Sequence, residues 1–356
     1  MATASESRAG HVETLRGLAC LLLVAYHVIG NDADHGMHVA DDSDWRVFTE
    51  IFMHLRMPLF SFISGYVFSS AVATAPELRI AYARKLRRIG IPFVVVSTLF
   101  YIGVGYAVPS HAQMPMWEIY FLPYEHYWYL QATLLIMALV LAVAFFAGGH
   151  RLVMFAALLP VSIFVFLLGL TFDPDLFALG SALYLLPYFL LGHLLRLSAL
   201  DRQIGGDGAQ RRVALLALGT VAGTVFLLDI ASVEGTLGID FSRQSAPGLA
   251  LGLSSCLFLF FLGARSRPLE AIGAYSYSIY LFHVFATAAF RQAVMASWPD
   301  MPRLLFFPAA LAVGLFVPIL LHHLFIRHRA SALLLLGIDV KPRRDGRRLV
   351  IGMAAR

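Results

Sequence analysis

Residues 14–31 read TLRGLACLLLVAYHVIGN, an apolar run that carries two ionisable side chains, Arg16 and His27. Its length is close to the roughly 20 apolar residues with which an α-helix crosses about 30 Å of hydrocarbon. Further apolar runs of similar length lie near residues 54–73, 89–108, 128–147, 152–172, 176–195, 212–231, 246–264, 271–294 and 304–326. The sequence therefore predicts an all-α fold, a polytopic membrane helix bundle of about ten transmembrane helices.

The amino-acid composition favours a membrane protein over a soluble one. Of the 356 residues, 59% are hydrophobic and 14% are charged, whereas soluble domains average about 25% charged residues. The net charge of +5 does not indicate nucleic-acid binding, because the basic residues cluster in the connections between the apolar runs. Cys20 and Cys256 both lie inside such runs, and no Cys/His spacing in the sequence is typical of a zinc site, so no metal is expected.

Charge alternates along the connections between the apolar runs. The connections after the second, fourth, sixth and eighth runs are basic, and their basic residues are Arg79, Arg84, Lys85, Arg87, Arg88, Arg151, Arg196, Arg202, Arg211, Arg212, Arg265 and Arg267. The intervening connections are more acidic, most clearly the first, with Asp32, Asp34, Asp41, Asp42 and Asp44. Since Lys and Arg mark the cytoplasmic side of a membrane protein, the pattern predicts that both termini are cytoplasmic. Residues 1–336 are expected to form the transmembrane domain, and residues 337–356 a basic cytoplasmic tail that contacts lipid headgroups.

The two ionisable residues of the first run lie on one face of the predicted helix. Arg16 and His27 are eleven residues apart, which is about 20° from three full turns and about 16–17 Å along the axis. Glu13 lies one turn before Arg16 on nearly the same stripe. With the N-terminus inside, Glu13 and Arg16 lie at the cytoplasmic mouth and His27 toward the outer half. Each residue alone is also explained as an interfacial anchor, but their common face indicates a functional site.

Two later segments combine polar residues with apolar surroundings. The second run contains Pro58 and the pair Ser64-Gly65, which fit either a kinked, closely packed helix or a functional cavity. The segment Arg84–Arg88 opens the third run, and it is either a topology anchor or a binding site for phosphate groups.

The fourth and ninth runs carry polar and aromatic side chains. Trp128 belongs to an aromatic cluster at the predicted outer interface, where such clusters are common. Ser276, Tyr280 and His283 follow i, i+4, i+7 spacing and share one polar face of an otherwise apolar helix.

In this order and spacing, from about residue 11 to residue 327, these segments resemble the acyltransferase-3 family of membrane O-acyltransferases. The residues that carry the resemblance are Glu13–Ala19 with His27, Met57–Phe60 with Ser64-Gly65-Tyr66, the basic run that ends at Arg88-Ile89, His126-x-Trp128-Tyr129-Leu130, and Ser276-x3-Tyr280-Leu281-x-His283. Two positions depart from the family pattern. Glu13 replaces the more usual aspartate, and Arg56 precedes Met57-Pro58 where relatives often have histidine.

The resemblance implies transfer of an acyl group, for example acetyl or succinyl, from cytoplasmic acyl-CoA to a hydroxyl of an extracytoplasmic glycan or lipid-linked sugar. Acyl-CoA is then a donor substrate and not a permanently bound cofactor. The resemblance also implies a chain that is integral to the cytoplasmic (inner) membrane of a bacterium and in contact with its lipid. The sequence gives no indication of the oligomeric state.

The resemblance also assigns roles to residues. It implies catalytic roles for His27, Arg16 and Glu13, CoA binding by Arg84, Lys85, Arg87 and Arg88, and a cavity lined by Ser64, Trp128, Ser276, Tyr280 and His283. Both Arg84-x-x-Arg87 and Lys85-x-x-Arg88 fit the family's basic pattern, so the pair that contacts CoA stays open. His27 is either a general base for the acceptor hydroxyl or a transient carrier of the acyl group.

Two other classes of protein fit parts of the pattern. A proton-coupled secondary transporter or flippase would also place His and Arg inside the membrane, but the sequence shows no pair of matching interrupted helices in two halves, the usual sign of inverted repeats. A non-catalytic sensor or scaffold gives no reason for Arg16 and His27 to share a face.

Overall fold

Helices make up most of the structure. The structure, a computed structural model, describes residues 4–107, 114–206, 208–342 and 348–351. Helices account for 78% of the chain, and the described residues contain two short strands, β1 (Asp339–Pro342) and β2 (Arg348–Ile351). These findings confirm the all-α prediction.

The number of helices that are able to cross a membrane is smaller than the predicted ten. Within the described residues, seven helical stretches are long and apolar enough: Gly10–Ile29, Ala75–Val104, Glu118–Leu167, Leu176–Leu197, Gly208–Val233, Ser276–Ser297 and Arg303–Phe325. An eighth is added if α11 (Ala246–Leu262) and α12 (Arg267–Gly273), which bend by 119° at their junction, form one span. The predicted count of ten and the cytoplasmic placement of the termini are therefore not confirmed.

Two regions account for the difference in the count. The second apolar run folds as α3 (Met53–Val67), which has 15 residues and is shorter than the roughly 20 residues with which a helix crosses the hydrocarbon core. The fourth and fifth runs form α6 (Trp128–Ala147) and α7 (Arg151–Leu167), which are joined by the 3-10 turn η4 (Gly148–His150) and count as one stretch of 50 residues.

The described chain divides into two compact units. The first comprises Met1–Tyr66 and Leu195–Leu320, and the second Val67–Leu194 and Leu321–Arg356. The helices that lie wholly or mostly in the first unit are α1 (Ala4–Ile29), α2 (Asp44–Ile51), α3, α9 (Leu200–Gly206), α10 (Gly208–Val233), α11, α12, α13 (Ser276–Ser297) and α14 (Arg303–Phe325).

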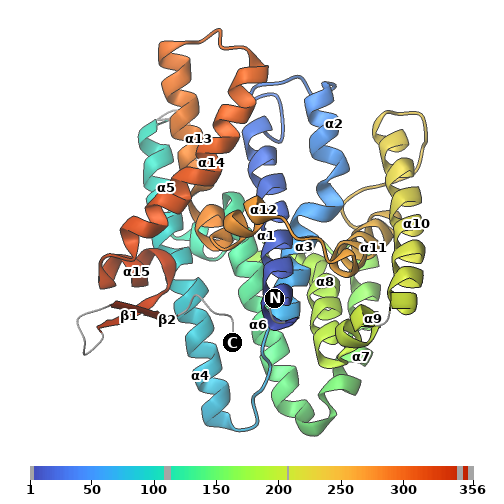
Figure 1. Cartoon of the computed structure of the whole chain (residues 1–356). Helices are drawn as coiled ribbons and strands as arrows, with labels where there is room; N and C mark the ends of the chain where they lie inside the picture. The colour runs from blue at the N-terminus through green and yellow to red at the C-terminus, as the bar shows by residue number, and fades with distance from the viewer. Residues whose placement is uncertain (1–3, 108–113, 207, 343–347, 352–356) are drawn as a thin grey trace. The chain divides into compact units, whose positions relative to one another are not determined.

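Helix α1 is the centre of the first unit, with α12 and α13 packed against it (Figure 1). The contact between α1 and α12 depends on two glycines. A Cβ atom on Gly17 would collide with the backbone carbonyl of Leu269, and one on Gly273 would collide with the carbonyl of Glu13. Small residues permit this close approach of two membrane helices, so the crossing fixes the position of the segment that carries Glu13 and Arg16.

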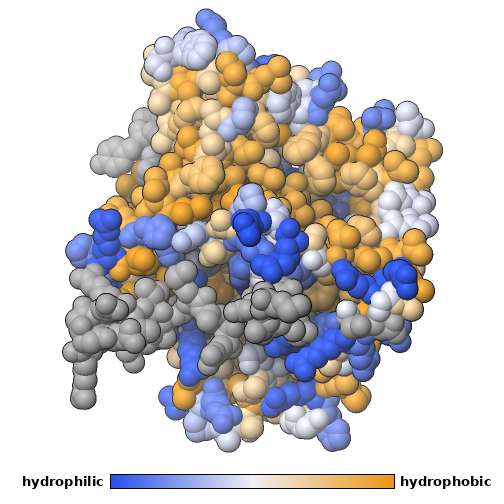
Figure 2. Space-filling view, viewed as in Figure 1, coloured by the Kyte–Doolittle hydropathy of each residue, from blue (hydrophilic) through white to orange (hydrophobic). Residues whose placement is uncertain are grey.

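Apolar side chains cover the outward faces of α10, α13 and α14. Leu216 on α10 is 72% exposed and Leu304 on α14 is 78% exposed. Figure 2 shows a largely apolar surface over α13 and α14. Because soluble proteins rarely expose continuous apolar surface of this kind, we infer that these faces contact lipid.

The second unit holds the remaining elements. They are α4 (Ala75–Lys85), the π-helical turn η1 (Leu86–Gly90), α5 (Ile91–Ala107), η2 (Glu118–Tyr120), η3 (Glu125–Tyr127), α6, η4, α7, η5 (Leu176–Ala178), most of α8 (Leu179–Leu197), α15 (Arg329–Leu336), β1 and β2. Thr74 and Glu77 form a capping box at the start of α4, which satisfies two backbone N–H groups of its first turn.

The C-terminal segment of the second unit packs against η1 and α5. Helix α15 contacts both and ends at Gly337, whose φ of 63° lies in the left-handed region that glycine adopts without strain. A side chain at this position would collide with the backbone of Arg87 and Arg88. Strand β1 follows and pairs antiparallel with β2. Of the predicted tail, residues 343–347 and 352–356 lie outside the described residues, and its boundary at residue 336 stays a prediction.

Candidate active site

Helix α1 of the first unit carries Glu13, Arg16 and His27, the three residues for which catalytic roles were predicted. Arg16 Nη1 donates to Glu13 Oε1 at 2.6 Å, one helical turn away, and both side chains are partly exposed. Toward the other end of α1, His27 Nδ1 lies 2.9 Å from the carbonyl oxygen of Leu23. Glu13 and Arg16 thus form an ion pair on the helix that also carries His27.

His27 and His283 are in direct contact, although 256 residues separate them in the sequence. His283 Nε2 lies 3.2 Å from His27 Nδ1, and the two rings form a T-shaped pair with centroids 4.7 Å apart. The side chain of His283 on α13 is 0% exposed, and its Nδ1 lies 2.8 Å from the Ile279 carbonyl oxygen and 3.0 Å from that of Tyr280. Two titratable rings are therefore held against each other inside the helix bundle of the first unit.

A second cation, Arg56, lies beside this histidine pair. Its guanidinium carbon is 3.6 Å from the centroid of the Tyr26 ring, and the Tyr26 and His27 rings are themselves 5.0 Å apart. Arg56 Nη1 donates to the Thr49 carbonyl at 3.0 Å, and its charge is close enough to act on His27. Arg56 was not among the predicted site residues. Its signal in the sequence is a single Arg in an apolar run, immediately before Met57-Pro58.

The predicted cavity residues of the first unit have different environments. Tyr280 is buried, and its ring lies 6.4 Å from that of His283. Ser276 is the first residue of α13 and is half-buried, and its carbonyl faces the Cys20 thiol at 3.9 Å. Ser64 is half-buried on α3. Of these residues, Tyr280 is the one that the structure places against the histidine pair.

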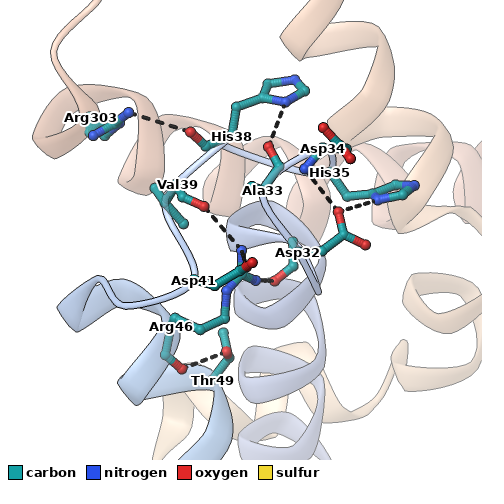
Figure 3. A network of polar contacts seen from close by, with 11 residues as sticks. Asp32, Ala33, Asp34, His35, His38, Val39, Asp41, Arg46, Thr49 and Arg303 are labelled. Atoms are coloured by element: carbon teal, nitrogen blue, oxygen red, sulfur yellow. Dashed lines mark hydrogen bonds and ion pairs between the residues drawn. The ribbon is translucent and has the colours of Figure 1, made fainter.

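The loop between α1 and α2 is held by a buried arginine. Arg46 on α2 is 6% exposed, and its guanidinium donates to the carbonyls of Gly30 and Val39 and lies 3.6 Å from Asp41. Figure 3 shows this side chain reaching from α2 into the loop. These contacts fix the end of α1 that follows His27.

Farther along the same loop, Asp32 Oδ1 lies 2.6 Å from His35 Nδ1 (Figure 3). This hydrogen bond from His35 lowers the pKa of the exposed Asp32 carboxyl, because it stabilises the charged form.

The second unit positions the predicted basic run. It spans the end of α4 and η1, and a π-helical turn is frequent at functional sites. Arg84 and Arg87 are exposed. In contrast, the Lys85 ammonium lies 4.5 Å from the Phe68 ring centroid, and Arg88 donates to the carbonyl oxygen of Leu336 at the end of α15.

An acidic residue of the C-terminal segment also faces the basic run. Asp339 lies 3.8 Å from Arg87 and 3.5 Å from Arg329, so one carboxylate faces two exposed guanidinium groups.

Trp128, the remaining predicted cavity residue, is half-buried at the start of α6 beside Tyr129.

The arrangement places a cation, Arg56, beside two imidazole rings that contact each other. Within the described ranges, no group of three or more His, Cys, Asp or Glu side chains is placed to hold a metal ion. A half-buried imidazole in contact with a buried one, with a guanidinium beside it, is suited to move a proton and to stabilise a developing negative charge.

Comparison with known protein families identifies the chain. A family model for the acyltransferase-3 domain matches residues 11–323. No curated protein and no solved structure matches the chain. The matched region contains the Glu13–Arg16 pair, His27, the basic run and His283, and the apolar helices agree with an integral membrane protein. The protein is therefore a membrane acyltransferase and belongs to the acyltransferase-3 family.

Proposed function

We propose that the protein transfers an acyl group from cytoplasmic acyl-CoA to a hydroxyl of a glycan or lipid-linked sugar on the other side of a bacterial inner membrane. The observation that carries this proposal is the contact between half-buried His27 and fully buried His283, with the Arg56 cation beside it. A thioester is already activated, so the enzyme needs a base for the acceptor hydroxyl and a cation for the oxyanion.

In this mechanism His27 acts as the general base. It takes the proton of the acceptor hydroxyl while the hydroxyl oxygen attacks the thioester carbonyl carbon, and a C–O bond forms. Arg56 stabilises the tetrahedral oxyanion. When the C–S bond breaks, the CoA sulfur leaves with the bonding electron pair and receives the proton from the His27 imidazolium.

His27 can also carry the acyl group in two steps. Its ring nitrogen then attacks the thioester carbonyl carbon first, the C–S bond breaks, and CoA leaves as the thiol with the imidazole proton. The acceptor hydroxyl oxygen next attacks the acyl-imidazole, the C–N bond breaks, and the hydroxyl proton returns to the imidazole. A burst of CoA release in the absence of acceptor would indicate this two-step route, whereas CoA release that requires acceptor would indicate the general base.

The donor side of the reaction is assigned to Arg84 and Arg87. Both are exposed and carry the charge and planar geometry that phosphate groups bind. The Lys85 ammonium lies over the Phe68 ring and Arg88 donates to the Leu336 carbonyl. Both side chains are half-buried, whereas Arg87 is exposed even though it lies 3.8 Å from the Asp339 carboxylate. Of the two pairs that fit the family pattern, we therefore assign Arg84-x-x-Arg87 to CoA.

His27→Ala tests the catalytic assignment. We expect loss of ester-linked acyl groups from the cell envelope when this variant replaces the wild type in a deletion strain, because the variant lacks the imidazole that we propose as the base. Mass spectrometry of envelope glycans and lipids measures the loss and identifies both the acyl group and the acceptor.

The control for that experiment is His35→Ala, which removes an exposed histidine of the loop after α1. It is expected to retain acylation at the wild-type level, and both variants must reach the membrane in equal amounts. Full acylation by His27→Ala would refute the proposed function.

A further inference from the structure

The surroundings of His283 select one tautomer of its neutral ring. Nδ1 lies within hydrogen-bond distance of the carbonyl oxygens of Ile279 and Tyr280, at 2.8 Å and 3.0 Å. Carbonyl oxygens only accept hydrogen bonds. The hydrogen of the His283 ring is therefore on Nδ1, and its Nε2 carries the lone pair.

That lone pair points at His27. Nδ1 of His27 lies 3.2 Å from Nε2 of His283 and 2.9 Å from the Leu23 carbonyl oxygen. His283 Nε2 and the Leu23 carbonyl oxygen are both hydrogen-bond acceptors. A hydrogen on His27 Nδ1 is able to bond to either of them, whereas an unprotonated Nδ1 would face two lone pairs with its own. The contacts thus favour the Nδ1–H form of His27, in which Nε2 is the basic atom.

We propose that His283 is a positioning residue: it fixes the tautomer and the orientation of His27, and so presents the Nε2 lone pair to the reaction. This inference rests on the proposed function, because it assigns the atom of His27 that acts there. Leu23 belongs to the same helix as His27, whereas His283 holds the ring from α13, through both the hydrogen bond and the T-shaped ring contact.

The histidine pair corresponds to two members of a catalytic triad: His27 is the base, and the neutral ring of His283 takes the place of the carboxylate that usually orients it. When Nε2 takes the acceptor proton, Nδ1–H of His27 becomes a charged donor, and its hydrogen bond to His283 strengthens. An ionised carboxylate at the same position would be costly inside a membrane helix bundle. A neutral imidazole orients His27 without that cost.

Two substitutions of His283 separate positioning from packing. His283→Phe keeps a ring against His27 but removes the acceptor, and His283→Gln supplies an amide oxygen that is able to accept from Nδ1–H. We expect His283→Phe to lower kcat about 100-fold and His283→Gln about 10-fold. The KM for the donor should stay within about two-fold in both, because the phosphate-binding residues are unchanged.

The assay uses full-length protein in proteoliposomes with an envelope lipid extract as the acceptor source. Acetyl-CoA and succinyl-CoA are the donors, and release of the CoA thiol is followed. Thr287→Val is the matched control: it lies one turn beyond His283 on α13, is also buried, and should keep wild-type kcat. Wild-type kcat in His283→Phe, or equal losses in the Phe and Gln variants, would overturn the inference.

A spectroscopic measurement tests the tautomer without relying on activity. In protein labelled with 15N-histidine, the His27 signals are those lost in His27→Gln, and their shifts report which nitrogen carries the hydrogen. We expect the Nδ1–H form in the wild type and a mixture of forms in His283→Phe. An Nε2–H form in the wild type would overturn the inference, whereas absence of CoA release from both donors by the wild type would count against the proposed function alone.

Discussion

The guanidinium of Arg56 is held by two contacts that leave its charge beside the histidine pair. It lies over the face of Tyr26, and one nitrogen donates to the Thr49 carbonyl. An arginine stacked on an aromatic ring keeps its full charge, so it is able to stabilise an oxyanion formed next to His27.

We expect Arg56→Ala to lower kcat about 100- to 1000-fold, and Arg56→Lys to fall between this variant and the wild type because lysine keeps the charge but not the planar stacking. CoA release at saturating donor measures both. Arg303→Ala removes an exposed arginine of α14 that donates to the loop carbonyl of His38 at 3.4 Å, and it should leave kcat unchanged. Wild-type kcat in Arg56→Ala would assign Arg56 to packing.

Where two residues lie on one helix, their spacing in the sequence predicted that they share a face. Glu13 and Arg16 pair one turn apart on α1, as helical periodicity requires. The partnership of His27 with His283 and the position of Arg56 beside Tyr26 depend on how α1, α3 and α13 pack. Periodicity within one helix contains no information on such packing, so the sequence placed His283 in the cavity without identifying its partner.

At the level of elements, the crossing of α1 and α12 depends on Gly17. We expect Gly17→Ala to lower the free energy of unfolding by about 1–3 kcal/mol, because the new methyl group collides with the backbone of Leu269. Thermal unfolding of the detergent-solubilised protein measures the change. The matched control is Gly103→Ala on α5, where no atom lies within 4 Å of the added Cβ. Ala is the better helix former, so this control should be neutral or stabilising, and equal effects of the two substitutions would contradict the close crossing.

Two neighbouring residues of the π-helical turn η1 are expected to have different roles: Arg87 binds the donor, and Arg88 supports the turn through the Leu336 carbonyl. We expect Arg87→Ala to raise the KM for acyl-CoA about 10- to 100-fold, because it removes a phosphate ligand. A thioester of 3′-dephospho-CoA should be less affected. Arg88→Ala should raise KM together with a loss of thermal stability, because the Leu336 carbonyl loses its donor. Equal stability in the two variants, or no change of KM in Arg87→Ala, would indicate that the basic run is a topology anchor and not a binding site for CoA.

The limits of element prediction also have physical causes. Apolar runs predicted the long helices closely, since composition decides which segments enter lipid. The predicted basic connection near Arg265 and Arg267 instead contains the short helix α12. Its glycine-mediated contact with α1 is a tertiary interaction, and seven residues with two polar side chains give no clear periodic signal.

The orientation of the whole molecule in the membrane rests on the charge of its connections. Both native cysteines are buried, so an introduced cysteine reports its own accessibility. We expect an impermeant thiol reagent to label Asp42→Cys in intact cells, and Arg79→Cys only after the membrane is opened, since positive charge marks the cytoplasmic side. The reverse pattern would invert the predicted topology.

For the whole molecule, the sequence predicted the class and family but not the two-unit division of the chain. The first unit joins residues 1–66 to residues 195–320, and no local pattern specifies a pairing over such a distance. The number of spans also depends on features that the apolar runs do not show. Helix α3 has only 15 residues, and α11 and α12 are separated by a bend of 119°.

The contact of Arg88 with Leu336 has a consequence for biosynthesis. The ribosome makes η1 after about a quarter of the chain and makes its partner carbonyl only near the end. A nascent or truncated chain that stops before α15 has the cations of the basic run without the backbone that supports them. The turn η1, which we assign to the donor, therefore gains the Arg88–Leu336 hydrogen bond only when synthesis is almost finished.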